Sequence, residues 1–177
     1  MVILVLNCGS SSIKYQVIDM EAASSKVLAK GIVERIGLAE GDLVHKPVGK
    51  ERFELRQPIP DHTTGIRLVL DALTDPAHGV IRSLDEVKAV GHRVAHGGEF
   101  FPESCLVTEE VKEKIRSLFE IAPLHNPANL EGVLSIEKVL PGVPQVTVFD
   151  TSFHQTIPAV NYMYALPHAY YDKYRVR

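Results

Sequence analysis

The first eighteen residues restrict the possible fold more than any other part of the chain. Val2 to Leu6 is a continuous apolar run, as in a strand that is buried on both faces. Asn7 to Ser12 is dense in turn-forming residues, and Ile13 to Ile18 is rich in β-branched and aromatic residues, which favour a second strand. Because the connection is too short for a helix, the sequence predicts a hairpin whose two strands are joined by a polar loop.

Further strands and helices are predicted after this hairpin. Helices are expected to begin near residues 63–64, after Thr108 as N-cap, and after Asn126 as N-cap with Pro127 at the first helical position. Residues 37–49 are expected to form a loop. The other predicted strands are Val27–Ile36, Glu51–Gln57, Val87–Val90 and Gln145–Phe149. Strands followed by alternating helices and strands predict an α/β fold, in which a mixed sheet carries helices on its faces.

The sequence pattern changes after Asp150. A chain of 177 residues is long enough for one domain, or for one domain and a fragment of another. We expect residues 1–150 to form the first domain. Residues 151–177 carry Pro158, Pro167 and several tyrosines without a closing element, so we expect them to begin a second, truncated domain.

Charge and cysteine content exclude several classes of function. The 19 Lys and Arg against 22 Asp and Glu give a formal charge of −3, and no polybasic run is present, so neither nucleic acid nor a membrane is an expected partner. Two cysteines, Cys8 and Cys105, are too few for a disulfide framework or a Cys-rich zinc site. The apolar start lacks a basic region and a cleavage site, so it does not resemble a signal peptide. A cytoplasmic location is expected.

Four polar clusters carry the residues suited to chemistry. Three of them follow or overlap the C-terminal end of a predicted strand, and the fourth begins a helix. Ligands of open α/β sheets collect at such edges. The clusters are Asn7–Lys14, Gly91–Glu99, Pro123–Pro127 and Phe149–His154.

The first cluster is suited to binding an anion. Ser10 and Ser12 offer hydroxyls and backbone N–H groups, and Lys14 adds a positive charge. The cluster is not a Walker A loop, because Lys14 follows Ile13 on a predicted strand instead of opening a helix. An ordinary hairpin turn is the alternative interpretation. Cys8 is interpreted as a small buried residue, because no base lies beside it in sequence.

The other clusters hold an arginine, a histidine and an aspartate. Arg93 has the planar fork that binds a carboxylate or phosphate through two hydrogen bonds. His125 lies at a helix start, where the positive end of the helix dipole favours anions. Asp150 follows a strand and has the chemistry of a base or a metal partner. Each of these residues also has a structural alternative, as a turn or hydrogen-bonding residue.

Together the four clusters resemble the acetate and propionate kinases of the sugar kinase, Hsp70 and actin superfamily. The resemblance covers essentially the whole chain, with the clusters in the family's order. It implies a ribonuclease H-like, actin-like ATPase domain with a mixed sheet of the five-stranded type. It also implies reversible transfer of the ATP γ-phosphoryl group to acetate, giving acetyl phosphate and ADP, with Mg²⁺ as cofactor.

The resemblance also implies roles for single residues. Asn7 corresponds to the magnesium-site residue, and Arg93 to the arginine that binds the substrate carboxylate. His125 corresponds to a histidine near the transferring phosphoryl group, and Asp150 to the acidic active-site residue, which we interpret as an orienting or magnesium-shell group. The remaining correspondences are Lys14, Ser10 and Ser12 at the nucleotide phosphates, and Ala95 and Leu124 at the pocket for the substrate methyl group.

Family members are roughly twice as long, and their second domain supplies the adenosine pocket and further catalytic residues. This chain alone is therefore expected to be inactive as a kinase, and the full-length enzyme is expected to be a homodimer. Two alternatives remain: a propionate or butyrate kinase, and a non-catalytic anion-binding module.

Overall fold

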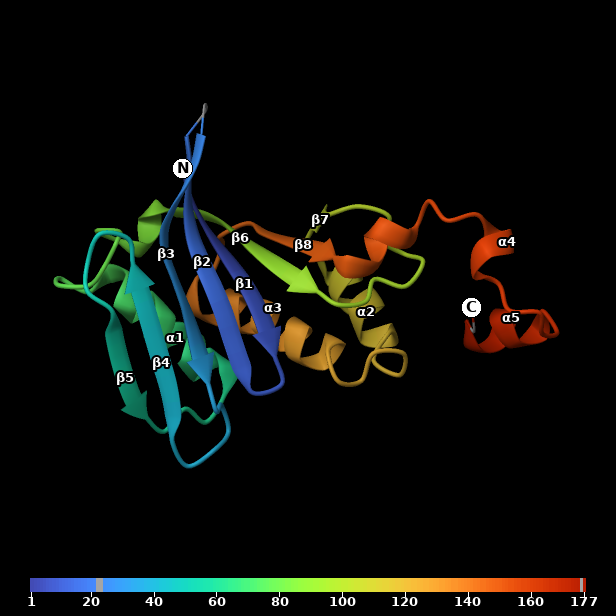
Figure 1. Cartoon of the computed structure of the whole chain (residues 1–177), viewed down its shortest axis with the longest axis horizontal. Coiled ribbons are helices and arrows are strands. Elements are labelled where there is room, and N and C mark those ends of the chain that lie inside the picture. Colours follow the sequence, from blue (N-terminus) through green and yellow to red (C-terminus); the bar gives the residue numbers. More distant parts are fainter. Residues whose placement is uncertain (22–23, 176) are drawn as a thin grey trace.

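The computed structural model contains one eight-stranded mixed sheet (Figure 1). The structure describes residues 1–21, 24–175 and 177. The order of the strands across the sheet is β5-β4-β3-β2-β1-β6-β8-β7. Their bounds are β1 Val2–Gly9, β2 Ser12–Glu21, β3 Ser24–Glu34, β4 Gly41–Pro47, β5 Phe53–Gln57, β6 Val87–Val94, β7 Cys105–Leu106 and β8 Gln145–Phe149.

The predicted hairpin is confirmed. β1 and β2 are antiparallel, with Gly9 opposite Ser12, so that only two residues form the connection. β3, β4 and β5 extend this antiparallel part, whereas β6 lies parallel to β1 and β8 lies parallel to β6. The carboxyl ends of β1, β6 and β8 therefore meet at one edge of the sheet.

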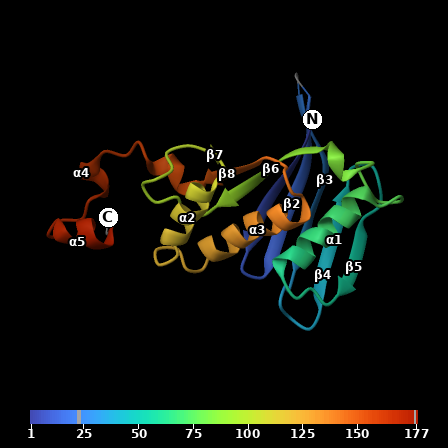
Figure 2. The same ribbon diagram turned by 180° about the vertical axis from the view of Figure 1, so that it is seen from behind.

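Helices cover one face of the sheet and leave the other face bare. Figure 2 shows α1 (His62–Thr74) and α3 (Asn126–Val139) lying side by side across the strands, with α2 (Glu109–Ser117) next to α3. Along β1, the side chains of Leu4, Leu6 and Cys8 are buried on the helix side, while the residues between them are more exposed. This alternation is the period-two pattern of a strand with one covered face.

Two apolar cores lie under the helices. The larger joins strands β1–β4 and β6 to α1 and the second half of α3. The smaller core, around Phe149, joins the ends of β6 and β8 to α2 and α3, and Phe149 is stacked on Phe101 with ring centroids 4.1 Å apart. The ends of β6 and β8 are thus packed against α3, which is the part of the fold that positions the polar clusters.

The sheet has more strands than the five-stranded type expected. Residues 37–49 are not a loop throughout, because β4 spans Gly41–Pro47. His45 is fully buried there, and its Nδ1 forms a hydrogen bond of 2.7 Å with the Tyr15 hydroxyl. A polar residue at a buried position hides the alternation on which the prediction depended. The two-residue strand β7 is too short to carry any pattern.

The predicted helix starts are close to the observed ones. Thr108 is the N-cap of α2, as predicted, and its hydroxyl accepts a hydrogen bond from the backbone N–H of Val111 over 3.3 Å. The prediction of Asn126 as N-cap is wrong: His125 is the N-cap of α3, and Asn126 is the first helical residue. The side chain of Asn126 is turned inward to the sheet instead of capping the helix, as described below.

The last part of the chain forms short helices beyond the sheet. A 3₁₀ helix, η2 (Asp150–His154), follows β8, and α4 (Ala159–Tyr162) and α5 (Ala169–Tyr174) come after it. Figure 1 shows α4 and α5 set apart from the strands. In the described ranges, the helices are all too short or too polar to cross a bilayer.

Candidate active site

The site lies where the parallel strands β1, β6 and β8 end. Asn7 is near the end of β1, Arg93 near the end of β6, and Asp150 directly follows β8. Their neighbours Leu6, Val94 and Phe149 point into the helix-covered core. Because successive side chains of a strand alternate, Asn7 and Arg93 are directed to the bare face, and Asp150, the first residue of η2, contacts Arg93 there.

A hydrogen-bonded chain joins these three side chains. Arg93 Nε lies 3.1 and 3.0 Å from the two carboxylate oxygens of Asp150, and Arg93 Nη2 lies 2.5 Å from Asp150 Oδ2. Arg93 Nη1 donates to Asn7 Oδ1 over 3.4 Å. The guanidinium is thus held from one side by a carboxylate and from the other by an amide oxygen, with N–H groups left for a ligand.

The environment keeps the guanidinium charged and accessible. The side chains of Arg93 and Asp150 are 41% and 48% exposed. The hydrogen bond to Asp150 is the main cause that raises the pKa of Arg93 above its usual range, and partial burial opposes it. A fixed, half-exposed cation at a sheet edge is suited to binding an anionic ligand.

The hairpin loop lies beside this chain of hydrogen bonds. Lys14 is directly opposite Asn7 in the β1–β2 ladder, and both side chains face the bare side. Ser10 is exposed in the turn and Ser12 is half-buried at its end. The turn is anchored from α1, because His62 Nε2 lies 2.7 Å from the carbonyl oxygen of Gly9.

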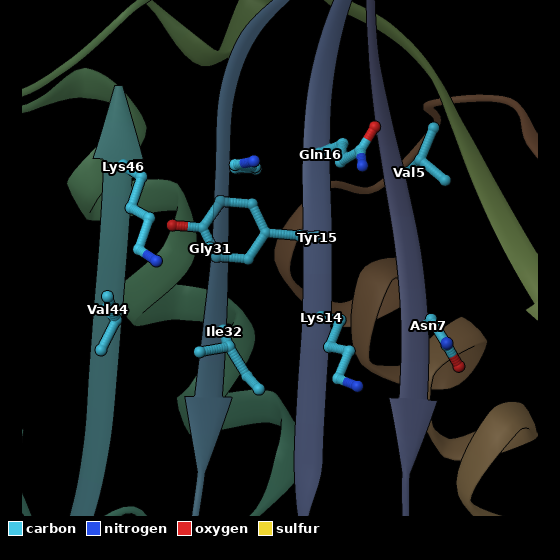
Figure 3. Close-up of a pocket in the computed structure, with 10 residues that line it drawn as sticks. Val5, Asn7, Lys14, Tyr15, Gln16, Gly31, Ile32, Val44 and Lys46 are labelled. Carbon is cyan, nitrogen blue, oxygen red and sulfur yellow. The ribbon is translucent and has the colours of Figure 1, made fainter. Parts of the chain in front are cut away.

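A hollow of about 520 Å³ opens on the bare face next to Asn7 and Lys14. Figure 3 shows both side chains projecting from neighbouring strands, with Tyr15 reaching across Gly31 toward β4. The apolar lining is Val5, Ile32 and Val44, and the polar lining includes Gln16, Lys30 and Lys46. No acidic residue lines this hollow in the described part of the chain.

Among the described residues, the hydrogen bonds of the Arg93 cluster do not include Leu124 or His125. Both are exposed before α3, Leu124 at 77%, and the His125 side chain makes no capping hydrogen bond. Ala95 lies two residues beyond Arg93 and its backbone N–H is bound by α3. The structure therefore brings Asn7, Arg93, Asp150 and Lys14 together, places Ala95 near them in the chain, and gives Leu124 and His125 exposed positions before α3.

Two buried asparagines in α3 were missed as functional candidates. The Asn126 side chain accepts a hydrogen bond from His96 N–H over 3.2 Å and donates one to the His96 carbonyl over 2.8 Å. The Asn129 side chain accepts from Ala95 N–H over 2.9 Å and donates to the Cys8 carbonyl over 2.6 Å. Asparagine is a poor helix former, so two of them three residues apart in one helix were a usable signal.

Cys8 is not suited to act as a nucleophile. Its side chain is buried, and burial raises the pKa of the thiol to about 12. A thiol is reactive as the thiolate, so the interpretation of Cys8 as a packing residue is confirmed. His92 is likewise buried, with Nε2 2.7 Å from Gln145 Oε1, and desolvation lowers its pKa to about 4.

The described part of the chain holds no ready-made group of metal ligands. Within residues 1–21, 24–175 and 177, no three side chains of His, Cys, Asp or Glu gather into a metal-binding group. The oxygen donors at the site are the amide of Asn7 and the carboxylate of Asp150. Magnesium is commonly bound by one or two carboxylates together with substrate phosphates and waters, so this donor set fits Mg²⁺ that arrives with a phosphate ligand.

Comparison with known proteins gives the family. The fold and site are those of an α/β domain with a polar cluster at the carboxyl ends of its parallel strands. The model of the acetokinase family matches residues 2–177, so the chain belongs to the acetokinase family. The chain is 53% identical to the acetate kinase of Desulfitobacterium hafniense (strain DSM 10664 / DCB-2) over all 177 residues, and 55% identical to that of Thermotoga maritima over 175 residues. It spans 44% and 43% of these relatives.

Solved structures agree in fold. The crystal structure of Porphyromonas gingivalis acetate kinase matches 97% of this chain and 43% of that one, with a TM-score of 0.92 and 47% identity. A propionate kinase from Francisella tularensis matches 98% of this chain and 43% of that one, with a TM-score of 0.88 and 36% identity. The expected actin-like ATPase fold is confirmed.

Proposed function

We propose that the full-length protein is an ATP-dependent acetate kinase, and that this chain carries its substrate-side groups. The reaction transfers the γ-phosphoryl group of ATP to acetate and gives acetyl phosphate and ADP, reversibly. The observation that carries the proposal is the placement of Arg93 between Asp150 and Asn7 at the carboxyl edge of the sheet. The similarity to acetate kinases over the whole chain supports it.

Arg93 is assigned to the carboxylate of acetate. Acetate is ionised at pH 7 and needs no general base to become a nucleophile. What the reaction requires is alignment of the carboxylate with the phosphorus atom and stabilisation of the charge on the phosphoryl oxygens. The contact of Asp150 with Arg93 supports a role for Asp150 in orienting the guanidinium, not in removing a proton.

The roles of the other residues are assigned from the family resemblance, and the places of Asn7 and Lys14 beside Arg93 support them. Lys14, Ser10 and Ser12 contact the nucleotide phosphates, and His125 lies near the transferring phosphoryl group. Ala95 and Leu124 contact the substrate methyl group. Asn7 would hold Mg²⁺ through its amide oxygen, and Asp150 would lie in the surroundings of the ion as an orienting group. The bound ion would neutralise charge on the phosphate oxygens.

Residues 151–177 are assigned to the beginning of a second domain, and residues 1–150 to the first. Several large apolar side chains of this segment are more than half exposed: Phe153, Val160, Tyr164, Leu166 and Tyr174. This exposure supports the assignment, because a second domain like that of the longer relatives would cover such side chains. The first domain alone is expected to show no turnover, since half of the charge stabilisation is absent. A cytoplasmic homodimer is proposed from the resemblance alone.

The test measures phosphoryl transfer by the full-length protein. ADP release is followed in a coupled assay with acetate, ATP and Mg²⁺, and acetyl phosphate is trapped with hydroxylamine as the hydroxamate. We expect turnover whose kcat/KM for acetate falls strongly on replacing Arg93 by Ala, with a rise in KM for acetate. Absence of turnover with any short-chain carboxylate would overturn the proposal and favour the anion-binding module.

A propionate kinase is the second candidate. The small side chain of Ala95 and the 36% identical propionate kinase structure favour it. The same assay with propionate and butyrate decides between the candidates, since the preferred substrate has the highest kcat/KM.

A further inference from the structure

Asn126 and Asn129 are buried polar residues that face the sheet from the first turns of α3. Their side chains are 0% and 2% exposed. An amide without hydrogen-bond partners in such a place would destabilise the fold. Among the described residues, every buried side-chain nitrogen and oxygen has a partner, and the partners of these two amides lie in the backbone of the site.

Asn129 connects the ends of two strands. Its Nδ2 donates to the carbonyl of Cys8, the residue after Asn7, and its Oδ1 accepts from the N–H of Ala95, two residues beyond Arg93. Gly132, one turn further along α3, permits this approach, since a Cβ there would lie 2.5 Å from Cys8 Sγ. One amide thus spans the ends of β1 and β6.

Asn126 continues the same connection beyond the sheet. β6 ends at Val94, and both the N–H and the carbonyl of His96 are bound by the Asn126 amide. The orientation of both amides is determined by chemistry, because each faces one backbone donor and one backbone acceptor. Ala95 and His96, which lie beyond the end of β6, are therefore held by side chains of α3.

We propose that Asn129, together with Asn126, is a positioning residue for the substrate site. The Asn129 amide fixes the distance between the ends of β1 and β6, and thereby the distance from Asn7 to Arg93, while the Asn126 amide holds His96 and so helps to fix the place of Ala95. The proposal rests on the function proposed above. It concerns two residues that touch neither Arg93 nor Asp150 and act through the backbone.

The geometry at Arg93 explains why a small shift matters. The Arg93 Nη1 to Asn7 Oδ1 distance is already 3.4 Å, at the long end for a hydrogen bond. A further separation of the strand ends breaks it, and the guanidinium then loses one of its two fixed sides. Misplacement of a reacting group by about 1 Å costs on the order of a hundredfold in rate.

The test compares Asn129→Ala and Asn126→Ala with Ser135→Ala in the full-length protein. Ser135 is a matched control, because it is also fully buried in α3 but its partners, Thr63 and Glu131, lie outside the site. Each variant is assayed at a temperature at which circular dichroism shows it folded. We expect KM for acetate to rise about tenfold or more in Asn129→Ala, with KM for ATP nearly unchanged, and expect Ser135→Ala to keep both values.

Two further measurements keep the proposal testable if Asn129→Ala does not fold. Asn129→Asp retains the acceptor for Ala95 N–H but places an oxygen against the Cys8 carbonyl, so it should raise KM for acetate as well. Hydrogen exchange of the Ala95 and His96 amides should be faster in the Asn129 and Asn126 variants than in wild type and in Ser135→Ala.

The outcomes separate the two proposals. Wild-type protein that phosphorylates no carboxylate overturns the proposed function, and the exchange rates still report whether the amides hold the strand ends. Active wild type with unchanged KM for acetate in the Asn129 variants, or an equal rise in Ser135→Ala, overturns the positioning role. Unchanged exchange at Ala95 and His96 overturns it as well.

Discussion

Replacing Asp150 by Ala separates the contribution of the Arg93–Asp150 pair to stability from its contribution to the site. Both side chains are between a third and a half exposed, so solvent screens their attraction. Pairs of this kind contribute about 0.2–1 kcal/mol to stability. For a domain of this size, that loss lowers the thermal midpoint by about 4 °C or less. We therefore expect Asp150→Ala to remain folded.

The expected effect on function is much larger. The Asp150 carboxylate accepts hydrogen bonds from both Nε and Nη2 of Arg93, and these contacts determine which guanidinium edge faces the ligand. Without the carboxylate, the side chain of Arg93 has several rotamers of similar energy. Loss of such positioning lowers the reaction rate by about a hundredfold. We expect kcat/KM for acetate to fall by roughly that factor in the full-length enzyme.

The assay is steady-state kinetics with acetate, ATP and Mg²⁺ each varied in turn. Asp42→Ala is the matched control, since Asp42 is paired with Arg56 Nε over 2.8 Å on the same sheet but far from β6 and β8. Unchanged kinetics in Asp150→Ala would refute the orienting role. A normal Mg²⁺ dependence together with reduced kcat/KM would support the orienting role and exclude Asp150 from the magnesium site.

Three further predictions concern packing, pH and substrate size. Gly132→Ala places a Cβ against Cys8, so it should destabilise the domain by about 1–3 kcal/mol in chemical denaturation, and Cys8→Ala should restore part of the loss. The pKa of His92 is lowered to about 4 by burial, so the unfolded chain binds the proton first on acidification. The free energy of unfolding should therefore decrease as the pH falls from about 6.5 to 4, and it should decrease less in His92→Gln. Ala95→Val should lower kcat/KM for propionate more than for acetate by a few-fold; equal losses would show that Ala95 is not in the pocket.

The parts of the fold that were predictable depend on local or apolar patterns. The hairpin follows from an apolar run, a short polar connection and a run rich in β-branched and aromatic residues, and β8 follows from a short segment rich in β-branched and aromatic residues, with the observed bounds. The cap at Thr108 is a local interaction between residues three positions apart. Such features need no knowledge of the rest of the molecule.

The parts that were missed depend on polar residues whose partners are distant in sequence. His45 occupies a core position of β4 because the Tyr15 hydroxyl, 30 residues earlier, satisfies it. Asn129 is satisfied by Cys8, 121 residues earlier. No local pattern predicts that such a residue is buried. For the site, the placement of Asn7, Arg93 and Asp150 at strand ends was predictable, whereas the contacts among them required the strand register.

The register between β6 and β8 is determined by a buried polar pair as well as by apolar packing. Apolar alternation excludes a slip of one residue, because that slip would turn Arg93 toward the helices. It does not exclude a slip of two residues, which keeps every side chain on its face. His92 lies opposite Thr147, so a two-residue slip that places it opposite Phe149 breaks its buried hydrogen bond to Gln145, which is 2.7 Å long. A two-residue slip would also move Arg93 about 7 Å along the strand from Asp150. Since Arg93 Nη2 and the Asp150 carboxylate are in contact in the observed register, the pair on the covered face contributes to the geometry of the ion pair on the bare face.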